Sequence, residues 1–88
     1  MRLALLAAAA LLLPTAAAHA DEPATPDERA RILAVLVAEG CSDPRKIERE
    51  TDDGRLKGYE VEDAKCADGV YDFDLDLNFA ITDRDRDD

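Results

Sequence analysis

The sequence has little that could support catalysis. It contains no tryptophan and no glutamine, and its single histidine and single methionine, His19 and Met1, lie in the first 20 residues. If that segment is removed, no imidazole remains, which excludes a Ser–His or Cys–His nucleophile pair and a histidine-ligated zinc site. Paired carboxylates could in principle serve a glycosidase, but the remaining residues, about 68, are too few to build a deep cleft. We therefore expect no enzymatic activity and no cofactor.

Positive charge is also scarce. The chain has 21 Asp and Glu against 11 Lys and Arg, a net charge of −10, and losing Arg2 with the first 20 residues leaves 21 acids against 10 bases, or −11. Binding to nucleic acid depends on Lys and Arg contacts to phosphate, so we exclude a nucleic-acid partner. The same charge disfavours adhesion to an anionic membrane surface. A basic partner, a bound cation and a solvated surface that keeps the chain soluble all fit this composition.

The first 20 residues have the pattern of a secretory signal peptide. Arg2 is followed by an apolar run from Leu3 to Leu13, a break at Pro14, and the small-x-small motif Ala18-His19-Ala20. We expect cleavage between Ala20 and Asp21, a periplasmic or secreted location, and no stable membrane insertion afterwards. An uncleaved anchor is the alternative, but the apolar run is shorter than the roughly 20 residues that span a bilayer. The predicted divisions are a signal peptide at 1–20, a short polar tail at 21–24 and one domain at 25–88.

Two cysteines, Cys41 and Cys66, remain in the predicted exported chain. A domain of this size buries only about 60% of its unfolded surface and commonly needs a covalent or metal staple. An even pair in an oxidising compartment is most simply a disulfide, and closing a loop of about 25 residues stabilises by roughly 3.5 kcal/mol in the chain-entropy model. The alternative, a redox or metal pair, fits poorly because the spacing is unlike a C-x-x-C motif. We predict a Cys41–Cys66 disulfide.

The segment after residue 24 predicts one amphipathic helix. Thr25 can cap it, Pro26 suits the first helical position, and Glu28 completes a capping box. Gly40 can end the helix in the left-handed conformation. The predicted helix spans Pro26–Glu39. Its apolar positions at helical spacing are Ala30, Leu33, Leu36 and Val37, with Ile32 and Val35 widening the stripe.

Two strands are predicted next, joined by a tight turn. The first, Arg45–Thr51, is polar with Ile47 as its apolar anchor, and Asp52-Asp53-Gly54 is a turn signal. The second, Leu56–Ala64, carries Tyr59 and Val61 on one face. The residues from Lys65 to Gly69 then read as a loop that contains Cys66.

The last segment alternates apolar and polar residues from Tyr71 to Thr82. We predict a hairpin with the three-residue loop Asp76-Leu77-Asn78 and Asn78 in the left-handed conformation, which pairs Leu75 with Phe79 and Phe73 with Ile81. Leu77 would be partly exposed. The charged tail at 83–88 would begin as the end of an edge strand, where its charges deter edge-to-edge pairing, and then fray.

Together these elements predict an α+β fold, in which one N-terminal amphipathic helix packs on a four-stranded antiparallel sheet. The order of motifs resembles the PepSY domain family, in which a helix ending in Gly precedes a KIE-E strand, a GYEVE strand and a DG-YD-DLD hairpin. The matching residues are Gly40, Ile47-Glu48, Gly58-Tyr59-Glu60-Val61-Glu62, Asp68-Gly69 and Tyr71-Asp72-Phe73-Asp74-Leu75-Asp76. The resemblance covers nearly all of the predicted exported chain. Asn78 replaces the usual Gly of the last hairpin, and the first hairpin turn is longer than in the shortest family versions.

The resemblance implies a non-catalytic role. PepSY domains occur in propeptides of thermolysin-like metallopeptidases, where an inhibitory and chaperoning role is proposed, and as small stand-alone periplasmic proteins. The cysteine pair is similar to that of a subgroup of small exported members. We therefore expect an interaction or peptidase-inhibitor-like module, whose partner is an envelope peptidase or another basic protein.

The alternative is an acidic envelope protein that binds divalent cations. Asp72, Asp74 and Asp76 are spaced as at the start of a calcium loop. However, Leu77 stands where that loop needs Gly, and Asp83 stands where it needs Glu. Alternation with aromatic residues indicates instead a strand with a solvated row of carboxylates, so these three residues are candidates only for weak cation binding.

Overall fold

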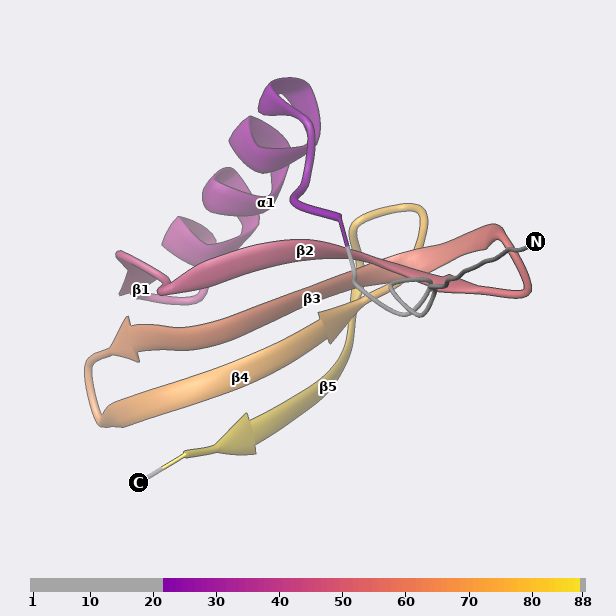
Figure 1. Cartoon of the computed structure of the whole chain (residues 1–88). Coiled ribbons are helices and arrows are strands. Elements are labelled where there is room, and N and C mark those ends of the chain that lie inside the picture. The colour runs from indigo at the N-terminus through magenta and orange to yellow at the C-terminus, as the bar shows by residue number, and fades with distance from the viewer. Residues whose placement is uncertain (1–21, 88) are drawn as a thin grey trace, which may run out of the picture.

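The computed structural model describes residues 22–87 and confirms an α+β fold (Figure 1). The predicted signal peptide, the junction between Ala20 and Asp21, and Asp88 lie outside the described residues. The elements are helix α1 (Pro26–Ala38) and strands β1 (Cys41–Ser42), β2 (Lys46–Asp52), β3 (Arg55–Cys66), β4 (Gly69–Leu75) and β5 (Ile81–Arg86). Among these residues, no helix combines the length and hydrophobicity needed to cross a membrane.

Helix α1 begins at the predicted residue and ends one residue before the predicted end. The Thr25 hydroxyl accepts the backbone N–H of Glu28 at 3.2 Å, and the Glu28 carboxylate accepts that of Thr25 at 2.9 Å, which completes the capping box. Gly40 has φ = 79°, as expected of a residue that ends a helix. The helix stops at Ala38, one residue before the predicted end, because Glu39 is its C-terminal cap.

Five antiparallel strands form one sheet, where four were predicted. Strands β1 and β2 both pair with β3, β1 near its end and β2 along the rest, and β4 and β5 follow on its other side. Sequence pattern missed β1 because two residues are too few to show alternation. Strand β3 also runs on to Cys66, so the Cys41–Cys66 disulfide joins directly paired residues of β1 and β3. The prediction that Cys66 lies in a loop was wrong, because Cys66 is the last residue of β3.

The hairpin between β4 and β5 also differs from its prediction. Leu75 pairs with Ile81 and Phe73 with Arg84, so the loop covers residues 76–80 and the three-residue loop was wrong. The left-handed residue is Phe79, with φ = 64°, and not Asn78. Its ring stacks on Tyr59 with 5.1 Å between the centroids, a contact that places Phe79 in the loop and shifts the register of β5.

The C-terminal charges are held in strand β5 as far as Arg86, further than the predicted fraying allowed. The Arg84 guanidinium lies 4.3 Å from the centroid of the Tyr71 ring, and that of Arg86 lies 5.9 Å from it. Arg84 also forms a 3.0 Å salt bridge with Glu39 at the end of α1. These cation–π contacts and the salt bridge tie the last strand to the rest of the domain.

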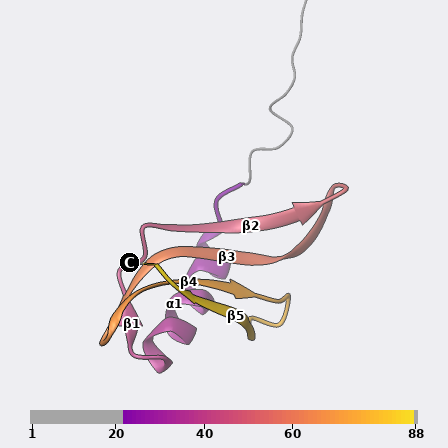
Figure 2. The ribbon, with the colours of Figure 1, turned by 90° about the horizontal axis from the view of Figure 1, so that it is seen from below.

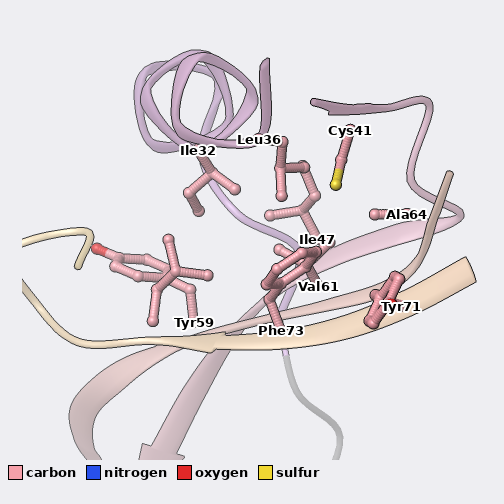
Figure 3. Close-up of a cluster of buried hydrophobic side chains, with 10 residues drawn as sticks. Ile32, Leu36, Cys41, Ile47, Tyr59, Val61, Ala64, Tyr71 and Phe73 are labelled. Carbon is pink, nitrogen blue, oxygen red and sulfur yellow. The ribbon is translucent and has the colours of Figure 1, made fainter. Parts of the chain in front are cut away.

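The hydrophobic core lies between α1 and one face of the sheet. Ile32 and Leu36 point from the helix toward Val61 and Phe73 (Figure 3), and all four side chains are fully buried. The ten buried core residues all fall between Ile32 and Leu75. They are Ile32, Leu36, Cys41, Ile47, Tyr59, Val61, Ala64, Tyr71, Phe73 and Leu75.

Candidate functional site

The sheet face opposite the helix is lined by carboxylates. Seen from below, the strands lie in front of α1 (Figure 2). Side chains alternate between the faces of a strand, so burial of Val61 and Phe73 against the helix turns Glu60 and Asp74 to the other face. Register places Glu60 directly opposite both Glu48 and Asp74, and Asp74 directly opposite Asp83. We name this line across four strands the carboxylate row. Its members are Glu48, Glu60, Asp74 and Asp83.

The carboxylate row is electrostatically unfavourable. Like charges directly opposite one another on neighbouring strands are destabilising. Burial raises the pKa of Glu60, and the charges of Glu62 and Asp74 raise it further. Burial likewise raises the pKa of Asp74, with further contributions from Asp83 and Asp72. Within residues 22–87, no Lys or Arg forms a salt bridge with Glu60, Asp74 or Asp83, so these three carboxylates are not directly neutralised.

Among residues 22–87, the Lys and Arg side chains that bridge carboxylates of this face lie toward its margin. Lys46 Nζ lies 3.2 Å from Glu48 Oε2 on the outer strand β2. Arg45 bonds Glu62, and its Nε donates to Asp63 Oδ2 at 2.6 Å. That hydrogen bond is the main reason why the pKa of Asp63 is lowered. The acidic face is therefore neutralised at one margin and left charged across its centre.

The structure does not unite the three predicted cation ligands. Asp72 and Asp74 lie on the same face of β4, but Asp76 lies in the loop, where its Oδ1 accepts the backbone N–H groups of Asn78 and Ala80 at 2.8 and 3.0 Å. The role of Asp76 is therefore to brace the loop.

Two other groups of three carboxylates have oxygens within 4.8 Å of one another. Carboxylates so arranged have the oxygen ligands that calcium prefers. Sequence reasoning missed both groups because their members come from different strands and only register brings them together. They are Glu48 with Glu60 and Glu62, and Asp63 with Asp72 and Asp87.

A second polar cluster fixes the start of the helix to the sheet. The Tyr59 hydroxyl donates to Glu28 Oε2 at 2.9 Å, and Arg49 Nε lies 3.2 Å from Glu28 Oε1. Burial alone would raise the pKa of Glu28, but the hydrogen bonds from Thr25 and Tyr59 lower it overall. Arg49 Nε is buried and forms no hydrogen bond of good geometry, so it is held by the ion pair with Glu28. Because the contacts of the cluster join the helix start to β2 and β3, we assign it a structural role.

The cysteines offer no further chemistry. Both Cys41 and Cys66 are consumed in the disulfide, so neither thiol can act as a nucleophile or a metal ligand. Comparisons with known proteins add no relative: no protein-family model matches the chain, and no curated protein or solved structure matches it significantly. The functional argument therefore starts from the acidic face.

The charge of Asp74 should cost stability. We expect Asp74→Asn to raise the free energy of unfolding by about 0.5 kcal/mol at neutral pH. Because the pKa of Asp74 is raised in the folded state, the ionised carboxylate lowers the stability of the fold. This loss of stability is complete at pH values above the pKa of Asp74 in the folded state. The penalty fades as the pH falls toward the ordinary value of 3.8, and the advantage of Asn should fade with it.

The measurement is urea denaturation from pH 7 to pH 3.5 at low and high salt. Asp52→Asn is the matched control, since Asp52 lies opposite Arg55 and its loss should not stabilise. High salt should shrink the gain from Asp74→Asn through screening. A gain that persists unchanged at pH 3.5 would show that charge is not its cause.

Proposed function

We propose that this chain is a small exported, non-catalytic interaction module of the PepSY type, whose acidic sheet face binds a basic protein such as an envelope peptidase. The proposal is supported chiefly by one observation: Glu60 stands between Glu48 and Asp74 with no salt bridge to any Lys or Arg of residues 22–87. A partner that places Lys or Arg over this line would relieve repulsion already present in the free protein. Complementary charge of this kind also speeds association and makes it sensitive to salt.

Binding of a ten-residue oligolysine peptide tests the assigned surface. We expect Glu60→Gln/Asp74→Asn to weaken the affinity about tenfold at low salt, since each lost charge contact is worth about 0.5–1 kcal/mol. The matched control is Asp52→Asn/Asp53→Asn, which removes the same charge from the last residue of β2 and the turn that follows it, and should change the affinity less than twofold. Equal losses in the two variants would mean that net charge, and not this face, attracts the peptide.

The partner itself can be sought with the same pair of variants as bait. An envelope protein captured by the wild-type chain and the turn variant, but not by Glu60→Gln/Asp74→Asn, would be a ligand of this face. If that protein is a peptidase, its activity with and without the chain tests the inhibitory role directly.

Calcium binding is the second candidate function, favoured by the two groups of three carboxylates. A ligand that binds only the folded state raises its melting temperature. If millimolar calcium raises the melting temperature while oligolysine fails to bind, the cation-binding function replaces the interaction module. No shift at millimolar calcium excludes it.

A further inference from the structure

The described part of the predicted polar tail, residues 22–24, is docked on the sheet. Residues Glu22–Ala24 lie along the outer edge of β2, with Pro23 opposite Glu48. The Ala24 N–H donates to the carbonyl of Ile47 at 3.0 Å, and the Arg49 N–H donates to the carbonyl of Glu22 at 2.7 Å. We name these three residues the N-terminal strap. Its pairing shows that the edge of β2 accepts an added antiparallel strand.

The strap is held lightly. The salt bridge between Glu22 and Arg49 is long, at 3.6 Å, and the Glu22 side chain is 73% exposed. Pro23 has no N–H to donate and is exposed. Ala24 packs on the margin of the core but does not belong to its ten buried residues. A longer strand could therefore replace the strap by making more backbone hydrogen bonds along β2.

The neighbouring side chains define the chemistry of such a strand. Pro23 lies opposite Glu48 and so on the acidic side of the sheet, while Ala24 lies on the helix side beside the core. An added strand in this orientation would place one side chain next to Glu48, at the end of the carboxylate row. Glu48 already pairs with Lys46 at 3.2 Å, but Glu60, directly opposite Glu48, has no salt bridge within residues 22–87, so a Lys or Arg long enough to reach it is favoured. Its neighbour in the place of Ala24 would have to be small or apolar. Alternating basic and small apolar residues meet both requirements.

We propose that the outer edge of β2 is a strand-addition site, at which an extended basic segment of the partner displaces the N-terminal strap and extends the sheet. The inference rests on the proposed function and specifies how the partner is bound. An exposed strand edge supplies the backbone hydrogen bonds for this mode of recognition, and alternate side chains give its specificity.

An eight-residue peptide alternating valine and lysine is a suitable probe. In the orientation of the strap, residues in the places of Glu22 and Ala24 turn their backbone groups to β2, and these are the valines. Methylating the backbone nitrogens of the valines removes the N–H groups that would donate to β2. This change should weaken binding to the chain beginning at Asp21 about tenfold or more. Methylating the backbone nitrogens of the lysines is the matched control, since it leaves the side-chain charges unchanged. It should weaken binding less than threefold.

The strap itself supplies a second readout. On saturation of the intact chain with the peptide, the NMR signals of Glu22 and Ala24 should move to random-coil positions, and the Ile47 and Arg49 signals should shift. A chain beginning at Thr25 should bind the peptide about fivefold more tightly, because nothing has to be displaced. If that shortened chain does not fold, the NMR measurement on the intact chain decides.

The outcomes separate the two proposals. Strand addition at β2 is overturned if both methylated peptides bind equally well and the NMR signals of Glu22 and Ala24 do not move, or if signals of β5 shift instead. Charge-driven binding to the acidic face would still stand after that result. Failure of the unmodified peptide to bind at low salt overturns the proposed function and this inference together.

Discussion

Reducing the Cys41–Cys66 disulfide is expected to lower the free energy of unfolding by about 3.5 kcal/mol. The bond closes a loop of 25 residues, and opening it frees the unfolded chain of that constraint. Domains of this size have a total stability of about 3–10 kcal/mol, so the reduced protein should be at the limit of folding. Strand β1 should be affected most, because it has only two residues and therefore few backbone hydrogen bonds to keep it paired with β3.

Urea denaturation with and without dithiothreitol measures the effect. Cys41→Ala/Cys66→Ala is the control, because it should be as unstable as the reduced protein and should not respond to the reductant. In hydrogen exchange, the reduced protein should lose protection first at the end of α1 and in β1, next to the broken link. A reduced protein that melts at the same temperature as the oxidised one would show that packing alone holds these elements.

Gly58→Ala is expected to be nearly as damaging, at about 3 kcal/mol, the upper end of the usual cost of overpacking. A methyl group at Gly58 would lie 2.2 Å from the carbonyl oxygen of Leu75 on the neighbouring strand. This oxygen belongs to the backbone and cannot turn away as a flexible side chain would. Strands β3 and β4 would have to separate where Tyr59 pairs with Leu75, two buried core residues.

The matched control is Gly54→Ala in the turn between β2 and β3. Gly54 has φ = 75° and open space around it, so the same change there costs only backbone strain, about 1–2 kcal/mol. Denaturation of both variants separates the clash from the strain. If Gly58→Ala were no less stable than Gly54→Ala, the two strands would have to be free to move apart at little cost. Near-ultraviolet circular dichroism of the two tyrosines, Tyr59 and Tyr71, would show whether the packing around them changes.

The features correctly predicted from sequence depend on neighbouring residues or on very few possibilities. The capping box of Thr25 and Glu28 and the left-handed conformation of Gly40 depend only on residues close in sequence. They can therefore be predicted without knowing the tertiary structure. The disulfide was predictable because two cysteines allow a single intramolecular pairing. The alternation in β4 likewise identified Tyr71, Phe73 and Leu75 as core residues, because a half-buried strand needs one apolar face.

The errors arose where distant residues decide the outcome. Alternation continues without interruption through the loop at residues 76–80, so the hydrophobic pattern does not mark where β4 ends. Stacking of Phe79 on Tyr59, a residue 20 positions earlier in the chain, settles that question. The sequence predicts a tail at Glu22–Ala24 because these residues have no strand pattern of their own, and they pair only because β2 offers an edge.

By itself, the sequence determined the helix and its ends, the pairing of the cysteines and the apolar face of the last long strand, because capping, covalent chemistry and alternation act over a few residues. Only the tertiary structure decided which carboxylates stand opposite one another. Glu48, Glu60, Asp74 and Asp83 lie on four strands, and a shift of one residue in any pairing would turn a strand's side chains to the other face. The proposed binding surface is thus a product of register, which contacts across the whole sheet set together.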